Sequence, residues 1–516
     1  MSIPFSSRKK DNLEILQELV RIVTPQKLQK ARPITEYKSH NKIRKLYDGI
    51  RAQKWKSERE AMNDIYGKDG SMNTFAKLKS DLSEKLIADI LLINLKDTDE
   101  PNAKKAHWEC MIKFNTAVFM YKFTPYDKAP QVLLEKILPK CLKFEFTDLI
   151  IAICEIFAWD YKLKADTRKG GYYEQLLMDH LQIQLAECKG KMFLGNIYAH
   201  YATNKSYKPV IAEQAISYLH ELSQVTIPYE THKTIYYKKM MEVIFYMSKF
   251  NYIKTADLCE ETIAYFEQKD FVIPSTLRAF YFQAIASYTY LRQPAKGYRL
   301  LYNCQQLVAN IGSVNWFKMQ ELTIMLALYS EDYSKAYDVF VETVNQERFT
   351  KQAAYVTEYW KLIEAMLYVV QCAGELTSTT NRPLQIRFST FVNSVPKLSQ
   401  DKSGTNFSIQ LIQLFTLLQK ETPKAYEEYT DRTEQLTNYF TRYCKDETMQ
   451  RTRWMFELTC LIPTSRFSST LVKNNAKVAE LIHKLRHTPY DITDNNLDIE
   501  IIPFDRFFQF MCSKLR

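Results

Sequence analysis

Glycine is scarce in this sequence, with only 11 residues in 516. Loops that cradle phosphate groups need backbone that bends freely and comes close to the ligand, so they depend on glycine. The chain contains neither a GxGxxG pattern nor a GxxxxGK pattern followed by Ser or Thr. These absences argue against a nucleotide-binding loop of either type.

Proline is also infrequent, and many of the 17 prolines fall where a periodic apolar pattern stops, as at Pro101, Pro274 and Pro423. Because proline interrupts helices, long runs without it favour helix over most of the chain. The hydrophobic fraction of 46% and the charged fraction of 25% are those of a folded protein. The sequence therefore predicts an all-α fold.

Paired cysteines are absent. The ten cysteines are isolated from one another and no CxxC pair occurs, which argues against a disulfide framework or a zinc knuckle. Long apolar runs are absent as well: LIADILLINL and LIIAICEIFAW are too short for a bilayer span. The N-terminus lacks the apolar core of a secretion signal. We expect a soluble cytoplasmic protein with reduced thiols and no membrane span.

Positive charge is concentrated at the N-terminus. Residues 1–60 hold 15 Lys or Arg and 7 Asp or Glu, so +8 of the formal net charge of +11 lies there. A basic region of this kind can meet nucleic acid or another acidic surface, and the alternative is a solvated helical surface. The residues predicted to make such contacts are Lys42, Arg44, Lys45, Arg51, Lys54 and Lys56.

The sequence predicts a helix that starts after Ser57, a turn that contains Gly67 and a second helix over residues 73–97. This helix–turn–helix order is also found in DNA-binding proteins. Ser57 is the expected N-cap of the first helix. The second helix is long for one that enters a major groove, and its exposed side mixes lysines with acids. Its unbroken apolar stripe favours helical packing over DNA binding.

Four similar pieces follow one another between residues 212 and 340: IAEQAISYLHEL, KTADLCEETIAYF, AKGYRLLYNCQQL and SKAYDVFVETV. Each piece opens a predicted helix and carries a small residue near its start, and these residues, Ala215, Ala256, Gly297 and Ala336, are 41, 41 and 39 positions apart. A period near 40, with small residues where two helices come close together, is typical of stacked helical hairpins. The sequence therefore predicts an α-solenoid.

Residues 190–372 resemble the tetratricopeptide-like helical repeats. In SEDYSKAYDVF, Tyr333 matches the aromatic residue of the turn, Ala336 the small contact position and Phe340 the next aromatic. The chain departs from the family in its period near 40 and in Ile324, and solenoids with longer helices are the alternative. The resemblance implies a curved stack whose first helices line a concave face that binds a peptide or a partner protein. Helical phase places Lys238, Met241, Phe245, Phe282 and Lys318 on this face.

The predicted organisation has four parts: a basic helical region over 1–100, a tetratricopeptide-like solenoid over 101–372, an irregular linker over 373–405, and a helical region with a capping segment over 406–516. Within the first three parts, helices are expected at 35–53, 102–123, 128–143, 147–163, 171–189 and 352–372. The final helix, from about residue 504, is expected to cover the last apolar face of the stack.

The sequence contains no complete motif for a metal site, a calcium-binding loop or a catalytic site. His483 and His487 could share a metal on one helix, but Lys484 stands where a metalloprotease has its glutamate. Asp491, Asp494, Asp498 and Glu500 do not match a calcium-binding loop, and a solvated acidic loop is the preferred interpretation. We predict no catalytic, cofactor-binding or metal-binding residues.

The function predicted from these observations is a non-enzymatic scaffold or adaptor that binds a partner segment in the concave face of a helical-repeat solenoid. The alternative is a nucleic-acid-linked regulator, in which residues 1–97 contact DNA or RNA and the repeats sense a partner. Neither the partner nor the oligomeric state follows from the sequence.

Overall fold

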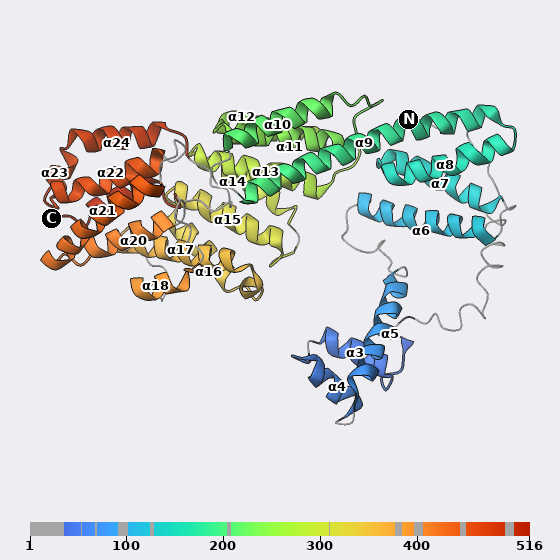
Figure 1. The fold of residues 1–516 in the computed structure, drawn as a ribbon, viewed down its shortest axis with the longest axis horizontal. Helices are drawn as coiled ribbons and strands as arrows, with labels where there is room; N and C mark the ends of the chain where they lie inside the picture. Colours follow the sequence, from blue (N-terminus) through green and yellow to red (C-terminus); the bar gives the residue numbers. More distant parts are fainter. Residues whose placement is uncertain are drawn as a thin grey trace. The chain divides into compact units, whose positions relative to one another are not determined.

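The protein is described by a computed structural model. It describes residues 33, 36–52, 54–67, 70–90, 102–123, 128–203, 208–308, 310–376, 384–396, 406–443, 450–490 and 500–516. Within these ranges all regular secondary structure is helical and no strand is found (Figure 1). The prediction of an all-α protein is confirmed. None of the helices in these ranges is long and apolar enough to cross a membrane.

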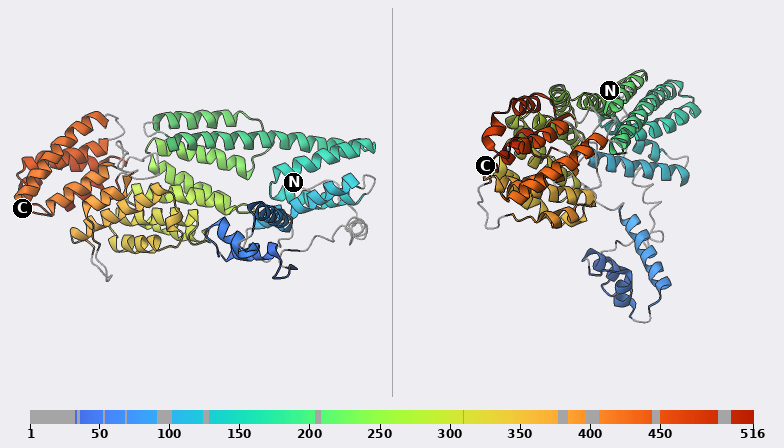
Figure 2. Two further views of the ribbon diagram at one scale, coloured as in Figure 1. Left: turned by 60° about the horizontal axis from the view of Figure 1, so that its bottom comes forward. Right: turned by 60° about the vertical axis from the view of Figure 1, so that its left-hand side comes forward.

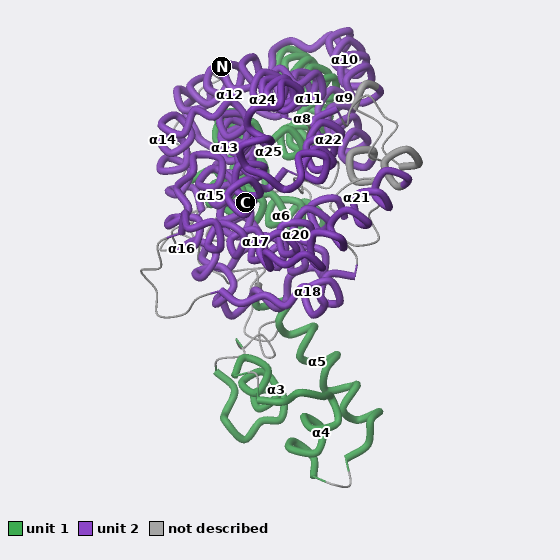
Figure 3. The backbone as a smooth tube through the Cα atoms, turned by 90° about the vertical axis from the view of Figure 1, so that its left-hand side faces the viewer, with its two compact units in different colours: residues 1–184 green, residues 185–516 purple. Residues whose placement is uncertain are grey.

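The chain divides into two compact units, residues 1–184 (unit 1) and residues 185–516 (unit 2), shown in different colours in Figure 3. The border falls inside a single helix, α9 (Thr167–Thr203), within the region predicted as one repeat domain. This helix is longer than the predicted 171–189: it begins at Thr167 and continues to Thr203, past residue 190, where the repeats were expected to begin.

Unit 1 contains a group of three helices, the short α3 (Lys42–Arg51) and α4 (Glu58–Tyr66) and the longer α5 (Met72–Ile90). The Ser57 side chain accepts a hydrogen bond from the amide of Glu60 at 3.3 Å, and Gly67 ends α4 with φ of 79°. Both are the predicted helix boundaries. The apolar stripe of α5 packs against α3 and α4.

The rest of unit 1 is formed by α6 (Asn102–Phe123), α7 (Ala129–Lys143), α8 (Thr147–Leu163) and the first half of α9. Their shared core includes Leu138, Ile153 and Phe157. The cysteines of this core are fully buried free thiols. Among the described cysteines none is in a disulfide, and Cys188 differs from the others in being exposed.

Unit 2 begins with helices that follow one another in hairpins: α10 (Lys208–Ser223), α11 (His232–Ser248), α12 (Tyr252–Glu267), α13 (Pro274–Tyr290), α14 (Pro294–Gln305), α15 (Val314–Tyr329) and α16 (Tyr333–Val344). Consecutive helices contact one another, and so do α11 with α13 and α13 with α15. Figures 1 and 2 show them side by side, coloured from green to yellow. The first helices of three successive hairpins are therefore neighbours.

The second half of unit 2 contains a short 3-10 helix (Phe349–Lys351), α17 (Ala354–Cys372), α18 (Phe388–Ser394), α20 (Asn406–Leu418), α21 (Pro423–Tyr443), α22 (Gln450–Thr464), α23 (Ser469–Lys473), α24 (Ala476–His487) and α25 (Phe504–Cys512). The region predicted as an irregular linker is therefore partly helical: among its described residues lies α18, which contacts α17 and α20.

Three hairpins share the same turn. Phe250, Arg292 and Glu331 follow the first helix of each hairpin with φ of 56°, 51° and 61°. After each of them, the next amide donates a hydrogen bond to the carbonyl five residues earlier, as from Asp332 to Ala327 at 2.9 Å. This is the bonding pattern of the Schellman motif. The left-handed backbone conformation costs a residue other than glycine about 1–2 kcal/mol. The packing of the two helices therefore has to offset this cost and hold the turn in place.

The four small residues of the repeat pattern lie where helices approach closely. Ala215, Ala256 and Ala336 are at most 1% exposed, and Gly297 is buried. A Cβ atom added to Gly297 would lie 2.8 Å from Cδ1 of Leu326 on α15. The prediction of a close helix approach is confirmed at Gly297, and the three alanines are buried as expected.

Replacing Gly297 by valine is expected to lower the free energy of unfolding by about 1–3 kcal/mol, because the branched side chain overlaps Leu326. Gly195→Ala in α9 is the matched control, since an added Cβ there meets nothing within 4 Å. Alanine should raise helix stability by up to about 1 kcal/mol at that site. Urea unfolding measures both changes; equal unfolding midpoints for Gly297→Val and wild type would contradict the close approach.

Candidate functional site

The five residues predicted to line a partner-binding face lie on the first helices of three hairpins. Lys238, Met241 and Phe245 are on α11, Phe282 is on α13 and Lys318 is on α15. Phe245 and Phe282 are half-buried and pack against the core of the hairpins. Met241 is fully buried in that core, so its assignment to a partner-binding face is corrected.

Both lysines of this face are paired within the chain. Nζ of Lys238 lies 2.6 Å from Oε1 of Glu230, and Nζ of Lys318 lies 2.7 Å from Oε1 of Glu321. Ion pairs that remain accessible to water contribute about 0–1 kcal/mol. An acidic partner could therefore replace the intramolecular partners with little loss of free energy.

The basic residues predicted to contact nucleic acid or an acidic partner lie on α3 and in its connection to α4: Lys42, Arg44, Lys45, Arg51, Lys54 and Lys56. Three of them have partners within unit 1. Lys42 lies over the ring of Tyr66 at 4.0 Å, Arg44 pairs with Asp48 at 2.8 Å, and Lys54 pairs with Asp64 at 2.7 Å. The hydrogen bond from Lys54 lowers the pKa of Asp64. Because these side chains already have partners, fewer than the six basic residues are free to contact a phosphate backbone.

The C-terminal helix α25 is enclosed on most sides within unit 2. Phe504, Phe507 and Phe510 are at most 2% exposed. Their rings contact Phe407 and Phe415 of α20 and Tyr333 of α16. In the end-on view of Figure 3, α25 lies among the surrounding helices of unit 2. A helix that only capped the end of a stack would bury one face, whereas α25 is buried around most of its circumference.

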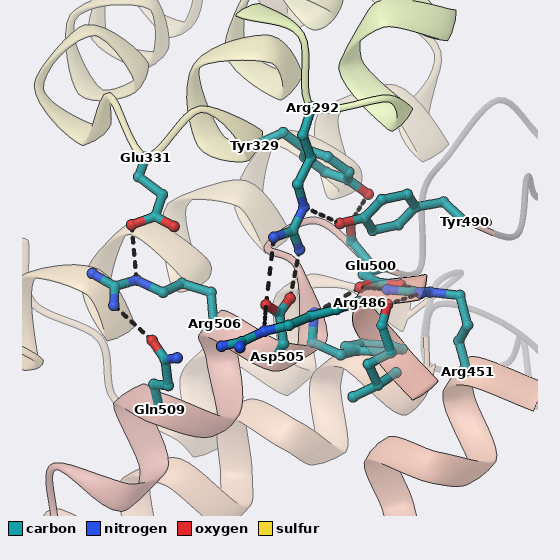
Figure 4. A network of polar contacts seen from close by, with 12 residues as sticks. Arg292, Tyr329, Glu331, Arg451, Arg486, Tyr490, Glu500, Asp505, Arg506 and Gln509 are labelled. Atoms are coloured by element: carbon teal, nitrogen blue, oxygen red, sulfur yellow. Dashed lines mark hydrogen bonds and ion pairs between the residues drawn. The ribbon is translucent and has the colours of Figure 1, made fainter. Parts of the chain in front are cut away.

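A buried ion pair lies just before α25. Arg451 of α22 donates two hydrogen bonds to the carboxylate of Glu500, at 2.8 and 2.7 Å, and their side chains are only 1% and 7% exposed (Figure 4). The same guanidinium donates to the carbonyls of Leu485 and Thr488. Burial opposes the charged form of Arg451, but the charge of Glu500 outweighs it and raises the pKa of Arg451.

This pair corrects the interpretation of the acidic run. Glu500 does not belong to a solvated loop, because it is buried and accepts hydrogen bonds from Arg451 and from the amide of Phe504 at 2.6 Å. Asp491, Asp494 and Asp498 lie outside the described residues. A buried carboxylate needs a charged partner, and here the chain supplies one from 49 positions earlier.

Asp505 is a second buried acid, held by two arginines. Arg292 lies 2.5 Å and Arg486 3.3 Å from its carboxylate oxygens (Figure 4). Burial alone would raise the pKa of Asp505, but hydrogen bonds and charge from Arg292 and Arg486 hold it below its usual value. The carboxylate is therefore ionised at neutral pH.

The side chain of Arg506 points away from that of Asp505 and contacts two acids, Glu331 at 3.2 Å and Glu375 at 2.9 Å.

Tyr490 lies near the two buried acids. Its backbone carbonyl accepts a hydrogen bond from the hydroxyl of Tyr252, and its ring lies 4.2 Å from the guanidinium of Arg451. Burial is the main cause of the raised pKa of Tyr490. Charged, aromatic and backbone contacts together thus hold Tyr490 and residues 500–506 in place.

These contacts come from equivalent hairpin turns. Arg292 and Glu331 are the left-handed residues of two successive turns, and they pair with the adjacent residues Asp505 and Arg506. Glu375 directly follows Gly374, which is the left-handed residue after α17. Successive hairpin turns therefore contact the first turn of α25 through paired charges.

The two histidines considered as metal ligands stack on each other. The rings of His483 and His487 have centroids 4.0 Å apart. Within the described ranges no cluster of three or more His, Cys, Asp or Glu side chains is placed to hold a metal ion.

Comparison with protein-family models, with curated proteins and with solved structures gave no match to this chain. Its function therefore has to be inferred from the chemistry and geometry of its own residues.

Proposed function

We propose that this protein is a non-enzymatic scaffold or adaptor that binds a segment of another protein. The binding face is formed by the first helices of successive hairpins in unit 2, α11, α13 and α15. In this proposal the hairpins form a tetratricopeptide-like solenoid, as the turn sequence SEDYSKAYDVF implies.

The observation that carries the proposal is the regular contact between these first helices. α11 contacts α13 and α13 contacts α15, although each pair is separated in sequence by a complete second helix. The same left-handed turn occurs after each of the three. Repeats related in this way form a continuous surface that can accommodate an extended partner.

The side chains of this face suit a peptide that carries both apolar and acidic residues. Phe245 and Phe282 are half-buried aromatic side chains that can contribute contact area without a large loss of conformational entropy. Lys238 and Lys318 can exchange their weak intramolecular ion pairs for acidic groups of the partner.

The chain's own C-terminus provides a precedent for this mode of recognition. Equivalent hairpin turns bind residues 505 and 506 through complementary charges, while aromatic rings of α16 and α20 enclose α25. The same repeated elements that hold an internal segment at the turns can hold an external segment on the first helices.

Affinity purification from the native cell tests the proposal. The double variant Lys238→Glu/Phe282→Ala should recover at least tenfold less of a specific co-purifying protein, since central aromatic contacts in interfaces contribute about 2 kcal/mol or more. Lys254→Glu on α12 is the control, because it makes the same charge change at an exposed position of a second helix. Equal recovery by wild type and the double variant would count against the proposed face.

A further inference from the structure

A cavity of about 520 Å³ lies in the second half of unit 2, apart from the face formed by α11, α13 and α15. Its lining comes from α17, the start of α18, α20 and α21. This volume falls in the range of small-molecule sites, which bury most of a ligand between a few elements. The cavity is half-open, so a ligand can reach it from solvent.

Hydrogen bonds fix two walls of this cavity. The side chain of Gln371 bonds to both backbone groups of Leu384, at 2.9 and 3.1 Å, which anchors the segment leading to α18 against α17. The side chain of Gln419 accepts a hydrogen bond from the hydroxyl of Tyr368 at 3.3 Å and donates one to Sγ of Cys372 at 3.1 Å. The cavity is therefore already formed without a ligand, which limits the ordering that binding requires.

The lining combines an apolar part with charged groups. Leu417 is 3% exposed, and Ile386 and Phe388 are half-buried, so together they offer an apolar surface. Arg387 and Lys420 line the same cavity, are exposed to solvent, and form no ion pair with any described residue. Elsewhere in unit 2 the arginines around α25 are paired with carboxylates. Two cations at a cavity whose lining has both polar and apolar parts provide groups that bind an anion.

We propose that this cavity binds a small organic anion with an apolar or aromatic body, such as a carboxylate or a sulfonate. Its anionic group pairs with Arg387 and Lys420, and its body lies against Phe388 and Leu417. Glu428 also lines the cavity, so the three charged residues sum to +1 and match a ligand with one negative charge. This inference does not depend on the proposed scaffold function.

Fluorescence titration of the full chain with 1-anilinonaphthalene-8-sulfonate tests the proposal, because this probe has one negative charge on an aromatic body. Saturable binding of one probe is expected. Arg387→Ala and Lys420→Ala should each weaken binding about tenfold, the size expected for the loss of one charge-assisted contact. Thr416→Trp should weaken binding at least tenfold, because the larger side chain takes up part of the cavity that Thr416 lines.

Two controls separate this site from general apolar binding. Lys424→Ala, an exposed lysine of α21 outside the cavity lining, should leave the affinity unchanged. The neutral probe N-phenyl-1-naphthylamine should bind wild type at least tenfold more weakly than the sulfonate. Equal affinity for both probes, unchanged affinity in the Arg387 and Lys420 variants, or unchanged affinity in Thr416→Trp would overturn the proposal.

Discussion

Replacing Arg451 by methionine is expected to lower the free energy of unfolding by about 3–5 kcal/mol, because the carboxylate of Glu500 would remain buried without its guanidinium partner. The carbonyls of Leu485 and Thr488 would lose a donor as well. Methionine keeps most of the length of the arginine stem, so the loss reports mainly on charge and hydrogen bonding. Urea unfolding of the full chain measures the effect.

An exposed pair of the same type supplies the control. Nη2 of Arg299 lies 2.7 Å from Oε2 of Glu260, but the two side chains are 57% and 34% exposed. Arg299→Met should therefore change stability by at most about 1 kcal/mol. The double variant Arg451→Met/Glu500→Met should recover part of the stability lost in Arg451→Met, because it removes the unpaired charge. Equal losses for Arg451→Met and Arg299→Met would show that burial does not set the strength of the pair.

Truncating Phe507 to alanine is expected to reduce stability by about 3–5 kcal/mol, since this ring is 1% exposed and packs against Phe415 of α20. The reason is that α25 lies inside the core of unit 2, where a cavity left by a phenyl ring cannot fill with water or collapse fully. The measurement is again urea unfolding, followed by a signal from the tryptophans of unit 2.

Gln509 is the matched control, because it is the exposed position of the same helix. Gln509→Ala should leave stability within about 0.5 kcal/mol of wild type. If Phe507→Ala were as stable as Gln509→Ala, α25 would be a peripheral segment rather than part of the core.

Local features of the fold could be predicted from the sequence. The helix expected over 147–163 has those bounds in the structure, and so does the one expected over 102–123. Apolar periodicity and proline positions are local signals, and each is contained within one helix. The spacing of small residues was also sufficient to identify the close helix contact at Gly297.

Contacts between distant segments could not be predicted in this way. Glu500 was expected in a solvated loop because it lies in an acidic run, but it is buried against Arg451. Arg292 and Asp505 are 213 positions apart, and no periodic pattern connects them. Long-range ion pairs depend on how completed helices pack, so a single sequence gives no direct signal for them.

Helical phase limited how accurately residues could be assigned to the partner-binding face. Met241 was assigned to the face, yet it is in the core, because a small error in phase moves a residue from the surface of a helix to its buried side. Phe245 and Phe282 retain partial exposure. The ion pairs of Lys238 and Lys318 depend on side-chain positions that the sequence does not specify.

The most direct measurement of the scaffold function is site-specific photo-crosslinking in the native cell, with p-benzoylphenylalanine placed at residue 282 on α13 or, as a control, at residue 302 on α14. Tyr302 is 68% exposed, so a crosslinker there is more accessible to chance collisions than one at the half-buried Phe282. A discrete crosslinked protein is expected from position 282 and not from position 302, and Lys238→Glu should reduce its yield. The same products from both positions, or none from position 282, would contradict a partner-binding face on the first helices.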